Sequence, residues 1–190
     1  MIICLTSAND SGGELDSSRL EQCLLGVAHE DSQALKELYD CTSASVYAFA
    51  LSILKNTQDA EDVLHDCYLH IYSGASGYRS FGKPMAWILT IARNLCLLKL
   101  RDRKRFSQTP LEDWEPYLKA CEAASPEDRI ILTECMKRLS DEERQIIVLH
   151  AVAGFKHRET AKLLQLPLST VLSKYNRAMK KLENDIGKEY

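Results

Sequence analysis

The chain has 190 residues, of which 45% are hydrophobic and 27% are charged, the balance of a soluble globular protein rather than of a disordered or membrane-spanning chain. Its net charge of −3 hides an asymmetry, since residues 1–66 hold twelve acidic and three basic residues. Two later stretches are basic: Arg93–Arg105 holds six bases and one acid, and Ser169–Lys181 holds four bases and no acid. Because phosphate contacts depend on local potential, such a chain can bind nucleic acid although it is acidic overall. The acidic front half suits a basic protein partner.

Several classes of protein are disfavoured by what the sequence lacks. Seven cysteines are scattered without a CxxC pair, and the N-terminus has no secretory signal, so we expect a cytoplasmic protein with reduced thiols. The densest apolar stretch, residues 85–92, is too short to span a bilayer, and no membrane insertion is expected. Phosphate-loop, GxGxxG and GxSxG motifs are absent, and the spacing of His65 and His70 is poor for a metal. We therefore expect no enzymatic activity and no cofactor.

The first half of the chain has the periodicity of helices. Residues 1–17 are mostly small and polar, which is typical of a flexible tail. From Leu20 to Lys104 apolar residues recur at three- and four-residue intervals, and Pro84 suits the first turn of a helix that carries Trp87. Sustained period-two alternation is absent from the sequence, so a sheet is not expected. The pattern predicts a helical domain over residues 18–105.

Residues 106–124 interrupt this periodicity with two prolines and few aliphatic side chains, which favours a flexible linker. Two helix start signals follow. In the first, Ser125 stands at an N-cap position before Pro126. In the second, Ser140 and Glu143 form a capping-box pattern. We predict a second helical domain over residues 125–190 and, for the whole chain, an all-α fold of two small domains.

The second domain has the spacing of a helix-turn-helix. The pattern predicts helices at about Asp141–Ala153, His157–Leu164 and Ser169–Asp185, with Gly154 closing the first. Only Gln165–Leu168 separates the last two, and a turn of this length lets the second helix enter the major groove of DNA.

The last of these helices has two distinct sides. An apolar stripe is predicted on one side, formed by Val171, Leu172, Tyr175, Met179 and Leu182. The other side carries hydroxyl and basic side chains that can bind phosphates and base edges. These candidate DNA-binding residues, which the family resemblance described below assigns to the −35 element, are Thr170, Ser173, Lys174, Arg177, Lys180 and Lys181. The same pattern also fits a small helical bundle with a solvated basic face.

Residues in both halves of the chain resemble those of a known family. Residues 139–182, with Leu139-Ser140, Glu142-Glu143-Arg144, Gly154 and Arg177-Ala178 among the matching marks, look like the −35-reading domain of extracytoplasmic-function (ECF) sigma factors of the sigma-70 family. Independently, residues 56–72 resemble the family's acidic helix that docks on RNA polymerase, and residues 85–105 resemble its −10-reading and melting segment. The two halves stand in the family's order.

The resemblance implies a sigma factor that binds core RNA polymerase and directs promoter-specific initiation. It implies core-polymerase binding by carboxylates on one helix: Asp59, Glu61, Asp62 and Asp66. It implies −10 DNA binding by aromatic, amide and basic side chains: Tyr78, Trp87, Arg93, Asn94, Lys99, Arg101, Arg103, Lys104 and Arg105. An extruded base would enter a pocket near residues 73–84, although Trp87 fits a core position equally well. Promoter DNA and an anti-sigma factor are the further partners implied.

Some residues depart from the family pattern. Leu172 stands where lysine is common, Lys174 where arginine is common, and Gln165 where the turn usually has glycine. Pro167 replaces a capping serine, and Lys156 leaves the second helix of the domain without a capping hydroxyl.

Two alternatives remain at the level of sequence. One is a helix-turn-helix regulator that binds DNA without being a polymerase subunit. The other is a helical interaction module with no role on DNA. Dependence on core polymerase distinguishes all three.

Overall fold

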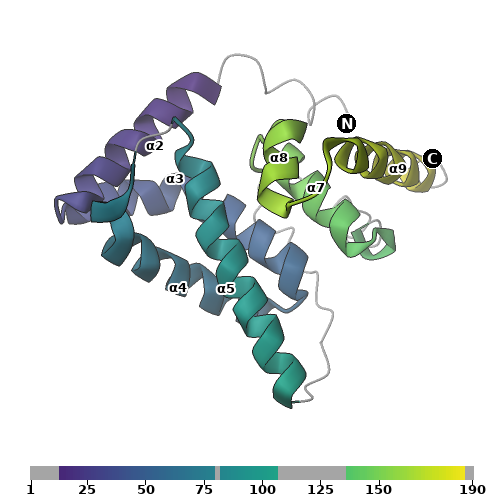
Figure 1. The fold of residues 1–190 in the computed structure, drawn as a ribbon, viewed down its shortest axis with the longest axis horizontal. Coiled ribbons are helices and arrows are strands. Elements are labelled where there is room, and N and C mark those ends of the chain that lie inside the picture. Colours follow the sequence, from purple (N-terminus) through teal and green to yellow (C-terminus); the bar gives the residue numbers. More distant parts are fainter. Residues whose placement is uncertain (1–12, 80–81, 107–135, 187–190) are drawn as a thin grey trace.

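The computed structural model describes residues 13–79, 82–106 and 136–186, and every regular element within these ranges is a helix (Figure 1). An N-terminal unit comprises α2 (Gly13–Ala28), α3 (Ser32–Leu54), α4 (Thr57–Gly74), the 3-10 helix η1 (Ala75–Gly77) and α5 (Pro84–Phe106). A C-terminal unit comprises α7 (Asp141–Ala151), α8 (His157–Leu164) and α9 (Leu168–Ile186). The all-helical architecture confirms the predicted fold class.

The structure corrects one boundary. Helix α2 begins at Gly13, so the last residues of the expected tail, 1–17, are helical. The remainder of that tail, residues 107–124 of the expected linker and the start signal at Ser125 lie outside the described residues.

Side-chain caps set the turns of the N-terminal unit. The Asp31 carboxylate accepts hydrogen bonds from the amides of Gln33 (2.8 Å) and Ala34 (3.3 Å) at the start of α3. At the other end of α3, Lys55 adopts a left-handed conformation, and the Asn56 side chain then caps α4 by accepting from the Asp59 amide at 2.9 Å. Two residues thus suffice to reverse the chain between α3 and α4.

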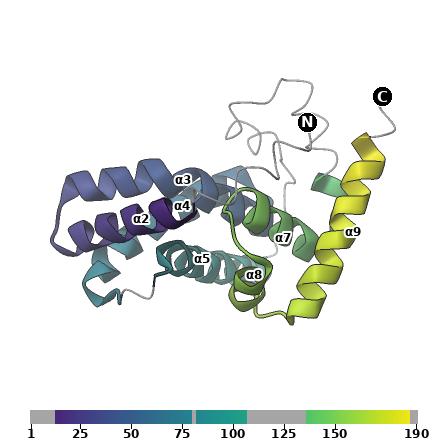
Figure 2. The ribbon, with the colours of Figure 1, turned by 90° about the horizontal axis from the view of Figure 1, so that it is seen from above.

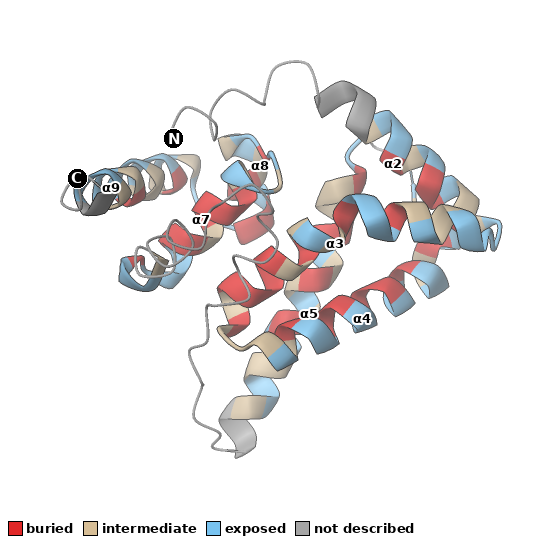
Figure 3. Cartoon of the chain, turned by 180° about the vertical axis from the view of Figure 1, so that it is seen from behind, coloured by how far each residue is buried: buried red, intermediate tan, exposed pale blue. Residues whose placement is uncertain are grey.

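The core of the N-terminal unit is apolar and closely packed. Phe49, Ile71 and Ile88, from three different helices, are fully buried. Inside this core, the hydroxyls of Thr42 and Tyr68 are 2.6 Å apart and satisfy one another. Figure 3 shows the buried residues as a continuous band where α3, α4 and α5 face each other.

The C-terminal unit relies more on polar groups. The predicted capping box is confirmed: the Ser140 amide donates to the Glu143 carboxylate at 2.9 Å, and the Glu143 amide donates to the Ser140 hydroxyl. Next to it, Arg144 is only 3% exposed and donates to the carbonyls of Met136 and Leu139 at 3.2 and 2.9 Å. These bonds fix the entrance to α7.

The helix-turn-helix forms despite its unusual residues. Gln165 takes the left-handed conformation (φ 58°) that the turn requires, and its amide donates to the carbonyls of Ala161 and Lys162. The Pro167 carbonyl accepts from the Val171 amide at 3.1 Å, so α9 begins at Leu168, one residue earlier than predicted. Lys156 provides no side-chain cap to α8, as expected, but its amide donates to the Glu159 carboxylate at 3.0 Å.

The two units are in direct contact (Figure 2). Helix α3 packs against α7, and buried apolar residues of both units form one continuous cluster that includes Phe49 and Leu149. Two ion pairs flank this contact: Lys55 lies 2.7 Å from Asp141, and Lys83 lies 2.5 Å from Glu159. The predicted domains therefore share part of their core in this structure.

Candidate polymerase and nucleic-acid interface

The predicted acidic and basic residues of the N-terminal unit partly neutralise each other. The Lys99 ammonium lies 3.2 Å from the Asp59 carboxylate and 2.6 Å from that of Asp62. Arg103 also pairs with Asp59, and it donates to the Leu54 carbonyl at 3.3 Å. This network joins α4 to α5, so Asp59, Lys99 and Arg103 have a structural role in holding the two helices together.

Other acidic residues of α4 remain open to a partner. Glu61 and Asp66 are exposed, and the side chain of Asp62 is 58% exposed despite its bond to Lys99. Exposed apolar side chains continue this surface, with Leu69 67% and Tyr72 48% exposed. The outer side of α4 is therefore an acidic surface that ends in an apolar patch.

The remaining predicted −10 residues lie along α5. Asn94 and Arg101 are exposed and Arg93 is half-buried. The side chains of Lys104 and Arg105 lie outside the described residues, although their backbone continues α5. The basic surface of α5 that is free for DNA is therefore smaller than its sequence indicates.

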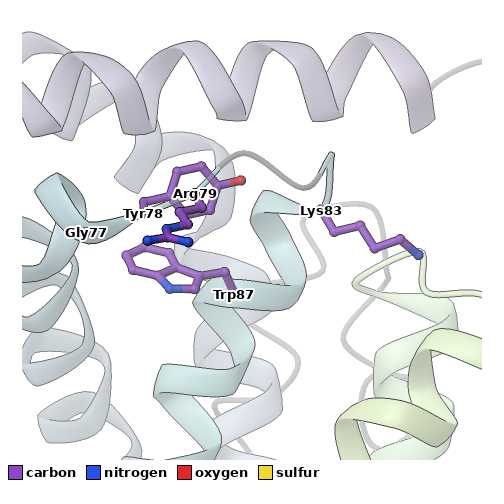
Figure 4. Close-up of a pocket in the computed structure, with 5 residues that line it drawn as sticks. All are labelled: Gly77, Tyr78, Arg79, Lys83 and Trp87. Carbon is purple, nitrogen blue, oxygen red and sulfur yellow. The ribbon is translucent and has the colours of Figure 1, made fainter.

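A cavity of about 210 Å³ opens at the start of α5, lined by Gly77, Tyr78, Arg79, Lys83 and Trp87 (Figure 4). The Tyr78 and Trp87 rings pack against each other with centroids 5.0 Å apart. In Figure 4 the Lys83 side chain points away from these rings and toward the C-terminal unit, where it meets Glu159. The cavity thus has an aromatic wall with the basic Arg79 beside it and Lys83 at its edge, the chemistry that suits a flat base attached to a phosphate.

Two carboxylates lie beside residues that line the cavity: Glu21 beside Tyr78, and Glu159 beside Lys83. The Tyr78 hydroxyl donates to Glu21 at 3.1 Å, and burial together with this bond raises the pKa of Tyr78 to about 12. Partial burial alone would raise the pKa of the Glu159 carboxyl, but Lys83 and the Lys156 amide outweigh it and hold that pKa below its usual range. Tyr78 is therefore neutral and Glu159 charged at neutral pH.

Two of the predicted −35 residues are held against α7. Lys174 is half-buried with its ammonium 2.7 Å from the Glu142 carboxylate, and Lys181 lies 2.7 Å from Glu143. Thr170 is also half-buried, whereas Ser173, Arg177 and Lys180 are exposed. The exposed side of α9 therefore overlaps the predicted one, but it is rotated about the helix axis so that it also includes Leu172.

This rotation corrects the prediction for Leu172. The apolar stripe was expected to bury it, but it is 40% exposed, while Ala178 is fully buried in its place. Asn176, exposed one turn after Leu172, was missed because an asparagine carries no charge signal. Its spacing of four residues from Leu172 is the signal that could have identified it. Arg79 and Lys83 were missed because no regular pattern marks the loop that contains them.

No metal site emerges among the residues that the structure describes, since no cluster of three His, Cys, Asp or Glu side chains is arranged for one. None of the described helices is long and apolar enough to cross a lipid bilayer.

A helix-turn-helix joined to a helical unit with an acidic surface and an aromatic cavity defines a helical DNA-binding protein with a protein partner. The sequence matches two family descriptions, Sigma-70 region 2 over residues 38–106 and Sigma-70 region 4 over residues 129–182. It is 31% identical over 175 residues to proteins named ECF RNA polymerase sigma factor SigK from Mycobacterium bovis and Mycobacterium tuberculosis, covering 88% of this chain and 94% of theirs. The chain belongs to the ECF RNA polymerase sigma factor family.

Solved structures share the fold. The sigma factor RpoE from Bartonella quintana, in complex with the anti-sigma factor NepR, matches with a TM-score of 0.66 at 21% identity, over 80% of this chain and 96% of that one. CnrH, in complex with the cytosolic domain of CnrY, matches with a TM-score of 0.60 at 21% identity, over 92% and 99% of the two chains.

Proposed function

We propose that this sigma factor directs core RNA polymerase to promoters by contacting DNA at two separate points, one in each unit. The observation that carries this proposal is the presence in one chain of an aromatic, basic cavity at the start of α5 and of a helix-turn-helix. A chain of this kind acts as a non-enzymatic initiation factor in the bacterial cytoplasm.

Core polymerase is the partner for the outer side of α4. Glu61, Asp62 and Asp66 supply the charge for a basic polymerase surface, which speeds encounter and fixes orientation. Asp59 acts indirectly, because its pairs with Lys99 and Arg103 hold α4 in place.

The −10 element is the ligand for the cavity and for α5. An unpaired base stacks on Tyr78 or Trp87, a sequence-tolerant contact worth about 1–3 kcal/mol per base. Arg93, Asn94, Arg101, Lys104 and Arg105 follow the strand along α5, with Lys99 and Arg103 contributing positive potential from within their ion pairs. Arg79 and Lys83 add phosphate contacts at the mouth of the cavity.

The −35 element is the ligand for α9. Ser173, Arg177 and Lys180 project from its exposed side and suit phosphates and base edges in the major groove. Thr170, Lys174 and Lys181 lie at the margin of this side, where they orient α9 and strengthen its positive potential.

The contact between the two units defines a closed form of the protein. When Lys83 binds a −10 phosphate, its bond to Glu159 is weakened, so engagement on a promoter favours separation of the two units. An anti-sigma factor that binds the closed form would keep the protein inactive. Of the solved structures named above, RpoE is in complex with the anti-sigma factor NepR, and CnrH is in complex with the cytosolic domain of CnrY.

A double substitution tests the division of labour between the units. Lys174→Ala/Arg177→Ala should lower transcription from promoters with a −35 element by tenfold or more, because it removes two positive charges from α9. Binding to core polymerase, measured by a gel-shift or by light scattering, should be unchanged. The matched control is Arg19→Ala/Lys36→Ala, which removes the same two charge types from α2 and α3. Equal loss in both variants, or loss of core binding in the first, would contradict the proposal.

A further inference from the structure

The exposed side of α9 combines an apolar and an amide side chain. Leu172 is 40% exposed, and Asn176 is exposed one helical turn further on. Residues four apart lie on the same side of a helix, so the two side chains are neighbours. The side-chain amide of Asn176 makes no hydrogen bond within the described part of the chain. Its donors and acceptor are therefore available to a ligand.

Helix α9 presents this pair in a fixed orientation. Lys174 bonds Glu142, Lys181 bonds Glu143, and Val171 and Ala178 are fully buried beneath them. These contacts place Leu172 and Asn176 on the side opposite α7. In Figure 2, α9 lies at the edge of the molecule, where nothing in the N-terminal unit covers its length.

The charges around the pair suit DNA rather than a protein surface. Arg177 and Lys180 are exposed beside Asn176, and Ser173 lies between Leu172 and Arg177. The Arg177 Nε donates to the Ser173 carbonyl of its own helix at 3.4 Å, which leaves the outer guanidinium nitrogens for phosphates. Neutral and basic side chains thus share the exposed side of α9, so the basic groups can hold the DNA backbone while the neutral ones reach the bases.

We propose that Leu172 and Asn176 determine the sequence preference of α9 by reading adjacent A·T base pairs in the major groove. This inference rests on the proposed −35 function and identifies what the helix reads. The side-chain amide of Asn176 accepts a hydrogen bond from N6 of an adenine and donates one to its N7. Leu172 packs on the C5-methyl group of a thymine. Leu172, which is 40% exposed, loses contact with water when it covers that methyl.

Atomic changes in the DNA test each contact separately. A DNA element selected from a randomised duplex library by binding to the full chain is resynthesised with 7-deaza-dA, which lacks the N7 acceptor, or with dU, which lacks the methyl. With the full chain and core polymerase, single 7-deaza-dA substitutions should reveal one position at which promoter binding falls on the order of tenfold. At a neighbouring thymine, dU should weaken binding about fourfold, the value of one buried methyl.

Protein variants then show which side chain makes each contact. Asn176→Ala should lose the sensitivity to 7-deaza-dA and keep the sensitivity to dU, and Leu172→Ala should do the reverse. The matched control is Asn184→Ala, which removes another exposed asparagine two turns further along α9. It should keep both sensitivities. Circular dichroism checks that each variant retains its helices.

The outcomes separate this inference from the proposed function. Transcription that depends on core polymerase, with sensitivities unchanged in Asn176→Ala and Leu172→Ala, overturns the inference alone. The same modified duplexes are also offered to the full chain without polymerase. Binding with the expected sensitivities but without any transcription would overturn the sigma-factor proposal and support the inference. If neither assay shows an A·T position that responds to these variants, the inference is wrong.

Discussion

The N-terminal unit is built on long helices around an apolar core, whereas the C-terminal unit depends on charged groups buried at its helix ends. Helices α3 and α5 each have 23 residues, and α8 has only 8. Both buried charged side chains of the described residues, Glu143 and Arg144, belong to the C-terminal unit. Polar networks lose more when a single partner is removed, because the remaining groups stay buried without partners. We therefore expect the smaller unit to tolerate fewer substitutions at its helix ends.

The largest expected effect is on the apolar core. Phe49→Ala removes a fully buried ring of α3 from the core cluster that both units share, and should lower the free energy of unfolding by about 4 kcal/mol. Chemical denaturation monitored by circular dichroism measures this. Because the core cluster is shared, both units should lose protection in hydrogen exchange. Loss confined to the N-terminal unit would show that the units do not stabilise each other.

Arg144→Ala should affect the C-terminal unit alone. It removes a buried guanidinium from the carbonyls of Met136 and Leu139, which should destabilise the C-terminal unit by about 3 kcal/mol. Hydrogen exchange should accelerate in α7 to α9 and remain slow in α4. Arg158→Ala, at an exposed position of α8, is the control and should cost less than about 0.5 kcal/mol. A similar effect of both substitutions would contradict the role given to the buried network.

The contact between the units should respond to charge reversal. Lys83→Glu places a second carboxylate beside Glu159. It should destabilise the contact between the units by about 1 kcal/mol, because an exposed ion pair of this kind contributes no more than about that much. Small-angle X-ray scattering should then detect a larger radius of gyration. The double variant Lys83→Glu/Glu159→Lys restores opposite charges and should restore the smaller radius. Unchanged scattering in the single variant would mean that this pair does not hold the units together.

The turn of the helix-turn-helix can be made more stable. Gln165 pays for a left-handed conformation that glycine adopts freely, so Gln165→Gly should stabilise the C-terminal unit by about 0.5–1 kcal/mol. Thermal denaturation should show a rise of a few degrees. Gln145→Gly, within regular helix α7, is the control and should have the opposite sign. Destabilisation by both would show that the side chain of Gln165 matters more than its backbone.

The smallest effect concerns pH. His157 stacks on His150 with ring centroids 4.7 Å apart and also packs on Tyr175. Burial lowers the pKa of His157, and the neighbouring His150 lowers it further. The unfolded chain therefore binds this proton more readily, so the C-terminal unit should lose stability as the pH falls below about 6.5. Denaturation of His157→Asn at pH 7.5 and pH 5.5 should show a smaller difference than the original protein, and an equal difference would contradict this origin.

Sequence patterns predicted those features, such as helix bounds and caps, that depend on residues close together in the chain. The bounds of α8 were predicted because its stripe of apolar residues is short and bounded, and the Ser140–Glu143 cap was predicted because both partners lie within one turn. The function of the chain followed from motifs in both halves.

Contacts between residues far apart in the chain determine the ion pairs and the side-chain exposures that the sequence did not predict. The pairing of Asp59 with Arg103 and of Lys83 with Glu159 joins positions far apart in the chain, and no local pattern encodes them. The exposure of Leu172 depends on how α9 rotates when Lys174 meets Glu142, so its apolar side chain alone indicated burial. For this reason the fold was predictable in more detail than the surface that reads DNA.

Run-off transcription tests the central claim most directly. Purified core RNA polymerase is incubated with genomic promoter fragments, with and without the full chain. The account predicts discrete transcripts that require both the chain and the polymerase, and that fall when Trp87 or Arg177 is replaced by alanine. The absence of a specific transcript from every fragment, under conditions in which the chain is folded, would contradict it.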